Sequence, residues 1–187
     1  MSLDRDVKKT KNLYLLVGKS GSGTTSIATA LCKIYPNTSA VKSVTTKPNG
    51  HGQNTDYYFL TDEEYDAANL VQHASFAGHR YGATYEEVDA ASWFVICPDG
   101  IQELREHYKN RPVVIIYLDA TDDTRKARML ARGDSEEDVT KRINNEALTF
   151  GSTPPDVITA HIDANGCFES VLAAVHGIIF YAEAIAS

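Results

Sequence analysis

A glycine-rich segment close to the N-terminus constrains the fold of this chain more than any other feature. An apolar, strand-like run at 13–17 leads into GKSGSGTT at 18–25, and helical spacing follows from about Ser26. The backbone N–H groups of such a loop converge on an anion, and the amino end of the next helix adds partial positive charge. We therefore predict an anion-binding loop here, in preference to a plain Gly/Ser turn.

One position of this loop departs from the pattern of phosphate-binding loops. That pattern, G-x-x-x-x-G-K-[ST], requires a lysine, but Thr24 stands in its place, while both glycines and Thr25 are in register. Thr25 is the residue whose hydroxyl can hold Mg²⁺. Lys19 lies next to the first glycine and has two interpretations: a substitute for the lost charge, or an exposed loop lysine.

The rest of the chain alternates between strand-like and helical patterns. Apolar runs of strand length recur at 13–17, 41–44, 93–97, 113–118 and 157–161, with helically spaced apolar residues between them. Short apolar strands separated by helices are typical of a buried parallel sheet with helices on both faces. We predict an α/β fold with a five-stranded parallel sheet.

The stretch 46–91 breaks this alternation. It contains two strand-like segments, 56–60 and 70–77, and two helix starts of capping-box form at Thr61 and Thr84. We interpret it as an inserted subdomain, with the core at 12–45 and 92–187. A second insert-like piece, at 133–138, separates two helices that are rich in arginine.

Composition limits the class of protein. The chain has 187 residues and a formal net charge of −7, so general nucleic-acid binding is not expected. Its three cysteines are far apart, the histidines show no metal-ligand spacing, and residues 1–12 lack the apolar stretch of a signal peptide. The longest strongly apolar run, at 113–118, is too short to span a bilayer. We expect a cytoplasmic protein without nucleic-acid or membrane partners.

The middle and later parts of the chain resemble the guanylate kinase family. The residues that carry the resemblance are SVTTKP at 43–48, DYYF at 56–59, FAGHRYG at 76–82, RMLARG at 128–133 and EDVTKR at 137–142. They occur in the family's order over nearly the whole chain. The resemblance implies a P-loop NTPase fold with a nucleoside-monophosphate-binding insert at 46–91 and a lid at about 132–142.

The resemblance also implies roles for particular residues. The ATP-binding loop would comprise Gly18, Ser20, Gly21, Ser22, Gly23, Thr24 and Thr25. Ser43, Tyr57 and Tyr81 fall where the family has hydroxyls that bind the acceptor's phosphate, and Lys47 falls at the first of its two arginines. No replacement for the second arginine is found.

The expected base site departs further from the family. Gln72 stands at a glutamate that accepts from two guanine N–H groups, Ala83 replaces a hydroxyl residue, and Cys97 replaces an aspartate. A glutamine offers only one acceptor, so a guanine-type pair of N–H groups would be half satisfied. Asp99, which follows the strand at 93–97, is either a support for Mg²⁺ through water or simply the residue of a Pro-Asp-Gly turn.

The residues of the expected lid match the family more completely than those of the base site. Arg128 and Arg132 are four residues apart and so share a helix face, and Arg142 follows on the next helix. In the family, arginines at these positions clamp the transferring phosphoryl group. For a single arginine, a solvated helix face paired with nearby acids would be the better interpretation. Three arginines at matching positions favour the functional one.

These resemblances predict transfer of the γ-phosphate of ATP, with Mg²⁺, to a nucleoside monophosphate, with GMP favoured. The catalytic residues would be Arg128, Arg132, Arg142 and Lys19, in a monomer or homodimer whose activity is weakened by Thr24. Two alternatives stay open. One is an inactive binding module that takes phosphorylated peptides at the old GMP site. The other is a kinase with a different acceptor base, since GSGTT resembles the loop of archaeal cytidylate kinases.

Overall fold

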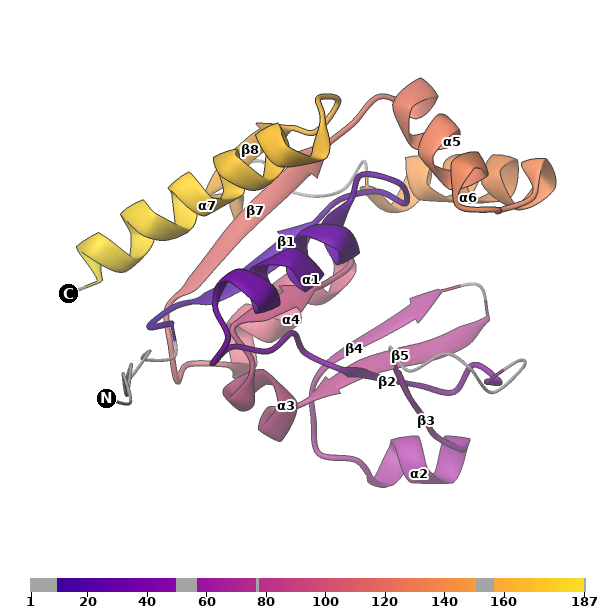
Figure 1. The fold of residues 1–187 in the computed structure, drawn as a ribbon. Coiled ribbons are helices and arrows are strands. Elements are labelled where there is room, and N and C mark those ends of the chain that lie inside the picture. The colour runs from indigo at the N-terminus through magenta and orange to yellow at the C-terminus, as the bar shows by residue number, and fades with distance from the viewer. Residues whose placement is uncertain (1–9, 50–56, 77, 151–156, 187) are drawn as a thin grey trace, which may run out of the picture.

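Four parallel strands form the core sheet of the protein, in the order β6-β1-β7-β8 (Figure 1). The computed structural model describes residues 10–49, 57–76, 78–150 and 157–186. The strands are β1 (Leu13–Val17), β6 (Trp93–Val95), β7 (Val113–Asp119) and β8 (Ala160–Asp163). Every residue of β1 is buried. A strand covered on both faces needs a continuous apolar run of this kind.

Helices cover both faces of this sheet, as predicted. Along β1, Tyr14 and Leu16 face one side, with α1 (Thr24–Ile34) and α7 (Phe168–Ile185). Leu13, Leu15 and Val17 face the other side, with α4 (Asp99–His107). The alternation follows from the two-residue period of a strand.

The predicted number of core strands was wrong by one. The run 41–44 forms no core strand: Ala40 makes an isolated parallel bridge with Trp93, and the N–H of Val41 donates to the carbonyl of Trp93 at 2.8 Å. Directly afterwards the chain enters β2 (Ser43–Thr45) of a second sheet. The run is therefore shared between two sheets and is too short to complete a strand in the first.

The second sheet is small and has the order β3-β2-β5-β4. Its other strands are β3 (Tyr57–Phe59), β4 (Leu70–Phe76) and β5 (His79–Thr84), and its helices are α2 (Asp62–Ala67) and α3 (Tyr85–Ala90). Thr61 forms the predicted capping box with Glu64, whereas Thr84 makes only its own half of one. The sequence did not predict β5, because its residues Gly82 and Ala83 lack the branched side chains of typical strands. The first residue of the predicted segment 56–60 and the end of 70–77 lie outside the described residues, as do residues 1–9.

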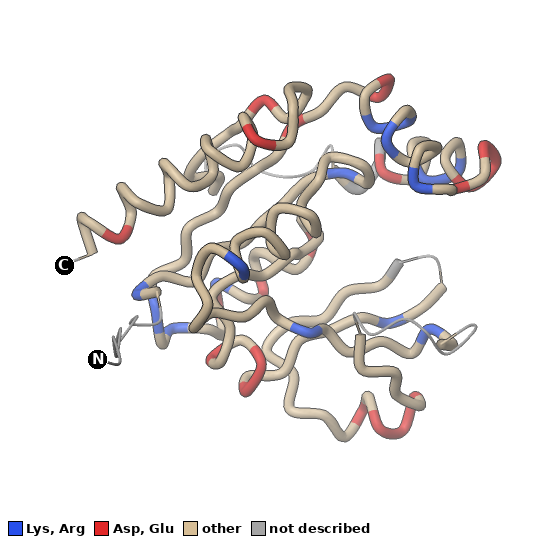
Figure 2. Tube along the Cα trace, viewed as in Figure 1, with Lys and Arg blue, Asp and Glu red and all other residues tan. Residues whose placement is uncertain are grey.

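Two helices connected by a short turn stand beside the core. They are α5 (Asp122–Ala131) and α6 (Glu136–Phe150). Gly133, with a φ of +99°, lies in the turn between them. Figure 2 shows that both helices carry interspersed basic and acidic positions. This pair contains the predicted lid at about 132–142; the boundaries of lid, insert and core stay a prediction.

The C-terminal helix α7 is the one helix within the described ranges that is long and apolar enough to cross a membrane by length and composition. Its residues Val171, Val175 and Ile179 are buried against the core sheet. Phe180 and Tyr181 on the other face are exposed. Its apolar composition is thus partly explained by its place in the core.

Candidate active site

A large cleft of about 1230 Å³ lies between the glycine-rich loop, the small sheet and the helix pair α5–α6. It collects residues that are far apart in the sequence, from the loop at 18–25 to Val171 in α7. Of the predicted site residues, those that line it are Gly18, Lys19, Ser20, Gly21, Ser22, Gly23, Thr24, Thr25, Ser43, Lys47, Tyr57, Gln72, Tyr81, Arg128, Arg132 and Arg142. Ala83 is not among them: it is fully buried and packs in the core beneath α4.

The loop has the backbone conformation that an anion-binding turn needs. Gly21 has a φ of +83°, and a Cβ there would lie 2.7 Å from the carbonyl oxygen of Arg125. Gly23 has a φ of +105° and caps α1, which begins at Thr24, two residues earlier than expected. The amino end of α1, with no acidic residue in its first turn, therefore opens on the cleft. Such a helix end favours a bound anion.

The loop's hydroxyl residues differ in exposure. Thr24, which stands where the pattern has lysine, is almost buried, whereas Thr25 is exposed. The hydroxyl of Ser22 is buried and has no hydrogen-bond partner within the described residues. Lys19 is half-buried in the cleft wall, and in the same part of the chain its ammonium has no ion-pair or hydrogen-bond partner. Among the described residues, no acid therefore pairs with the positive charge next to the first glycine.

The expected acceptor side brings hydroxyls and one ammonium together. Tyr57 and Tyr81 lie on neighbouring parts of the small sheet, with ring centroids 5.8 Å apart in an edge-on arrangement. Ser43 starts β2, and Lys47 follows the same strand at an exposed position. All four line the cleft opposite the loop and α5–α6. Hydroxyls and an ammonium can hold a phosphate, although less rigidly than two guanidinium groups.

Gln72 is held firmly at the floor of this region. It is only 3% exposed, and its Nε2 donates to the carbonyl of His73 at 2.6 Å. Its side chain packs on Gly100 in the first turn of α4, where a Cβ would come within 2.7 Å of Cδ. Its Oε1 has no partner among the described residues, which leaves one acceptor for a ligand. That a guanine-type pair of N–H groups would be only half satisfied here stays a prediction.

Cys97 and Asp99 stand at the carboxyl end of β6, next to Gln72 in the cleft wall. Burial raises the pKa of the Cys97 thiol, and the carboxylates of Asp99 and Glu146 raise it further. The thiol therefore stays neutral at physiological pH, so it cannot replace the charge of the family's aspartate. Asp99 itself is exposed to the cleft.

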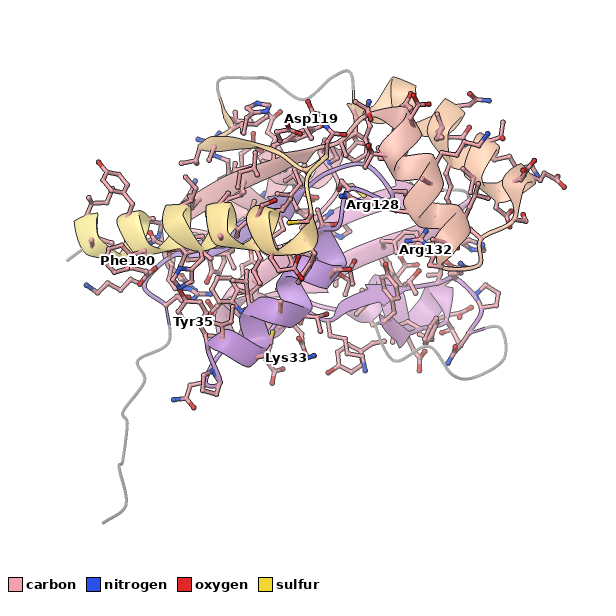
Figure 3. All side chains as sticks on the ribbon, turned by 45° about the horizontal axis from the view of Figure 1, so that its top comes forward. Lys33, Tyr35, Asp119, Arg128, Arg132 and Phe180 are labelled. Carbon is pink, nitrogen blue, oxygen red and sulfur yellow. The ribbon has the colours of Figure 1, made fainter. Side chains whose placement is uncertain are left out.

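The three predicted lid arginines face the same cleft. Arg128 donates to the carbonyl of Gly166 at 3.0 Å and lies 3.5 Å from the carbonyl oxygens of Gly21 and Ser22. Arg132 donates from Nε to Asp134 at 3.0 Å, and this contact lowers the pKa of the Asp134 carboxyl. Figure 3 places Arg128 and Arg132 on the side of α5 that faces the loop and the small sheet. Arg142 enters the cleft from α6.

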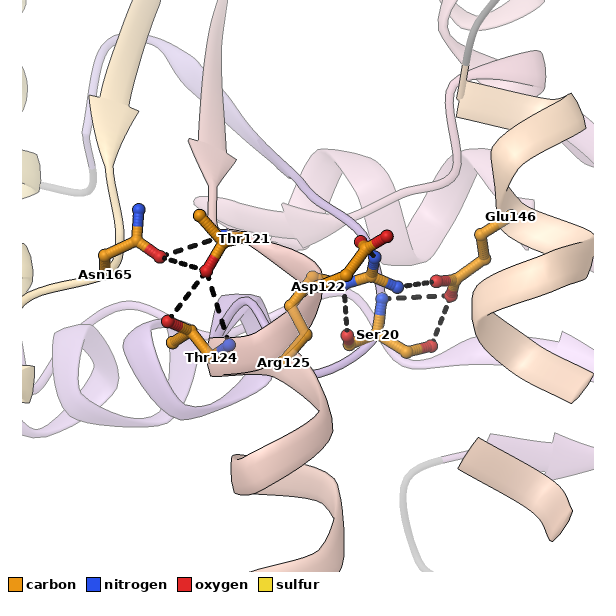
Figure 4. Close-up of polar contacts among 7 residues, drawn as sticks. All are labelled: Ser20, Thr121, Asp122, Thr124, Arg125, Glu146 and Asn165. Carbon is orange, nitrogen blue, oxygen red and sulfur yellow. Dashed lines mark hydrogen bonds and ion pairs between the residues drawn. The ribbon is translucent and has the colours of Figure 1, made fainter. Parts of the chain in front are cut away.

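Sequence reasoning missed two charged residues at this site. Arg125 and Glu146 form a buried ion pair beneath the loop and contact Ser20 (Figure 4). Arg125 belongs to the same basic run as Arg128, but its burial had no sequence signal. Glu146 lies on a polar helix, and nothing in its neighbourhood distinguished it from solvated acids.

The donor set fits Mg²⁺ that arrives with a polyphosphate. No group of three or more His, Cys, Asp or Glu that could hold a metal ion occurs within the part of the chain that is described. Thr25 and Asp99 nevertheless offer a hydroxyl and a carboxylate to the cleft. Magnesium uses one or two protein oxygens together with phosphates and water, and these two residues would hold it in that way.

Comparison with known proteins agrees with the predicted resemblance. Residues 10–179 match the family model described as guanylate kinase. The chain belongs to the guanylate kinase family. A guanylate kinase of Granulibacter bethesdensis is 29% identical over 168 residues, which are 81% of this chain and 79% of that protein. A guanylate kinase of Helicobacter pylori is 30% identical over 147 residues, 72% of this chain and 71% of that protein.

A solved structure has the same fold. The crystal structure of guanylate kinase from Anaplasma phagocytophilum covers 94% of this chain and 88% of its own, with a TM-score of 0.63 at 20% identity. Family and fold are therefore as predicted, and the comparisons support a nucleotide-binding kinase.

Proposed function

We propose that this protein transfers the γ-phosphate of ATP to GMP, with Mg²⁺ bound alongside the ATP phosphates. The observation that carries the proposal is the convergence of three arginines, an anion-binding loop and a set of acceptor-side hydroxyls on one cleft. The names of its relatives, which are guanylate kinases, support the same acceptor.

The proposed roles follow from the chemistry of phosphoryl transfer, which depends on positioning and charge stabilisation rather than on a protein nucleophile. Backbone N–H groups at 21–25 and the amino end of α1 hold the donor phosphates. Lys47 and the hydroxyls of Ser43, Tyr57 and Tyr81 hold the acceptor's phosphate. Mg²⁺ held by Thr25 and Asp99 would neutralise phosphate charge when bound.

The arginines Arg128, Arg132 and Arg142 stabilise charge that develops during transfer, and Lys19 adds charge at the start of the loop. Because Thr24 supplies none, we expect slow turnover. Arg132 is paired with Asp134, so to contact the phosphate it would exchange this partner. In this exchange Arg132 would leave one anion, the Asp134 carboxylate, for another, the phosphate. No buried charge would have to be exposed, since the Arg132 side chain is already half exposed.

The test is a coupled ADP-release assay with each common nucleoside monophosphate, on native protein and on Arg132→Ala. We expect transfer to GMP and a fall in kcat of roughly a hundredfold in the variant, with KM for GMP almost unchanged. Arg105→Ala is the matched control, because Arg105 is exposed on α4 and lies outside the cleft.

A protein that binds GMP or a phosphopeptide equally well in all variants, and transfers phosphate in none, would instead be a binding module. The retained arginines argue against this, because a peptide binder has no donor phosphate for them to clamp. Transfer to another nucleoside monophosphate in place of GMP would support the kinase activity but contradict the proposal that GMP is the acceptor.

A further inference from the structure

Arg125 and Glu146 form an ion pair that is removed from water. Their side chains are 1% and 6% exposed, and Nη2 of Arg125 bonds to Oε2 of Glu146. Nη1 of Arg125 also donates to Asp122 at 2.5 Å. The guanidinium group is thus shared between two carboxylates and is not available to phosphate.

Together the pair binds all three polar groups of Ser20, the third residue of the phosphate loop (Figure 4). Nε of Arg125 donates to the carbonyl of Ser20 at 2.9 Å, and the N–H of Ser20 donates to Oε1 of Glu146 at 2.9 Å. The Ser20 hydroxyl donates to the same oxygen. Ser20 precedes Gly21, where a Cβ would lie 2.7 Å from the carbonyl oxygen of Arg125, so only a glycine fits against this part of α5. The loop therefore has a fixed orientation relative to both α5 and α6.

The same two residues lie one helical turn from two lid arginines. Arg128 is three residues after Arg125 on α5, and Arg142 is four residues before Glu146 on α6. Residues at these separations share a helix face. By fixing one point of each helix on the loop, the pair sets the direction from which both arginines approach the loop's anion site.

Stability alone is a weak explanation for such a pair. Both charges lose their hydration, so a buried ion pair is often no more stabilising than apolar residues of similar volume. Its hydrogen bonds, in contrast, are strongly directional, because the guanidinium fork and the carboxylate fix the relative orientation of the groups they join. The pair is thus better suited to fixing the relative orientation of the groups it joins than to stabilising the fold.

We propose that Arg125 and Glu146 are positioning residues that align the phosphate loop with the lid arginines during phosphoryl transfer. The proposal rests on the proposed function. Since Thr24 stands in place of the usual lysine, more of the charge stabilisation has to come from side chains on α5 and α6, and a small misplacement of them lowers the rate strongly. Alignment acts on the rate of transfer and on simultaneous binding of both nucleotides, with little effect on each nucleotide alone.

The decisive variant is Arg125→Met/Glu146→Met, which replaces both charges and leaves neither one unpaired. We expect kcat to fall by roughly a hundredfold, while KM for each nucleotide and the melting temperature change little. The matched control is Gln102→Met/Glu106→Met, which removes an exposed hydrogen-bonded pair from α4, 2.8 Å apart, whose residues do not line the cleft. The control should keep the native kcat.

Glu146→Gln is the second variant, in case the double variant does not fold. Its amide keeps an acceptor for Ser20 at similar size but loses the charge that orients Arg125, so kcat should fall while the melting temperature holds. A kcat within threefold of native in either folded variant, or a fall no larger than that of the control pair, would overturn the positioning role. A fall in kcat that only follows a fall in melting temperature would do the same.

A binding measurement separates this proposal from the proposed function. The probe is a bisubstrate analogue in which adenosine and guanosine are joined through a polyphosphate, measured by calorimetry beside ADP and GMP. The Arg125→Met/Glu146→Met variant should bind the analogue about tenfold more weakly and each single nucleotide as the native protein does. If the native protein binds the analogue but transfers no phosphate, the proposed function fails. The alignment is then still judged by the ratio of the analogue's dissociation constant to that of each single nucleotide, compared between variant and native protein. An unchanged ratio overturns the alignment.

Discussion

Gln72→Glu should improve recognition of guanine at a measurable loss of stability. In the native protein the Gln72 amide is almost buried and donates to the carbonyl of His73 at 2.6 Å. A glutamate loses that donor and places a carboxylate oxygen against the carbonyl. Leaving a buried polar group unsatisfied costs about 1–3 kcal/mol, which for a chain of this size lowers the melting temperature by roughly 2–10 °C.

The same carboxylate offers two acceptors to a guanine. One additional charge-assisted hydrogen bond contributes about 1.5–3 kcal/mol, so GMP should bind roughly 10- to 150-fold more tightly relative to AMP. Bound GMP should also restore much of the lost thermal stability, since a ligand that binds only the folded state stabilises it. Because burial raises the pKa of a carboxyl group, the gain should increase with pH.

Calorimetry with GMP and AMP, beside thermal unfolding with and without GMP, checks this prediction. Gln102→Glu is the matched control, because Gln102 is exposed on α4 outside the cleft and, like Gln72, uses its Nε2 as a donor, here to Glu106. A native protein with a strong preference for GMP, and a variant with no gain, would refute the reasoning that the amide limits recognition.

Three further predictions concern the loop and the stability of the fold. Thr24→Lys should raise the transfer rate, and Lys19→Ala should weaken ATP binding less in that background than in the native one; strictly additive effects in the double-mutant cycle would make Lys19 a mere surface lysine. Burial acts to raise the pKa of Glu183, but hydrogen bonds from Tyr14 and from the segment before β1 hold it below its usual range. This stabilisation is therefore present above about pH 4.3 and is lost as pH falls through the lower folded pKa, so chemical unfolding of Glu183→Gln should depend less on pH in that window. Ser92→Ala should leave the free energy of unfolding unchanged or raise it by up to about 1 kcal/mol, because the Ser92 hydroxyl is buried without a partner within the described ranges.

The strand, glycine-rich turn and helix at 13–34 were predictable because their signal is local. The strand, the glycines and the helix are contiguous in sequence, and each glycine position follows from backbone geometry at that position. The central strands were predictable for a similar reason: a strand buried on both faces must be a continuous apolar run, as at 13–17 and 113–118.

The missing fifth strand and the unexpected β5 had no such local signal. Residues 41–44 have the composition of a core strand, but Ala40 pairs with one sheet and Ser43 with another. β5 has a weak strand composition and is formed because it pairs with both β2 and β4. In each case a partner distant in sequence decides the outcome.

The contact between Ser20 and Glu146 shows the same limit at the site. The two residues are 126 positions apart, and their pairing depends on how α6 returns to the loop after the turn at Gly133. The lid arginines were found only because their order resembles a known family. Glu146 is distinguished from other acids by its burial, and this property can be recognised only in the folded structure.

The placement of positive charge has a physical consequence for this kinase-family member. In the usual loop a lysine carries its charge on the loop itself, so the charge is present in every orientation of the lid. Here Thr24 is nearly buried at the start of α1, and Arg128 of α5 lies 3.5 Å from the carbonyl oxygens of Gly21 and Ser22. Under the proposed function, the charge opposite a transferring phosphoryl group would therefore depend on α5 and α6 in addition to the loop. Thr24→Lys should raise the rate for this reason, and it should also make transfer less sensitive to substitutions at Arg125 and Glu146.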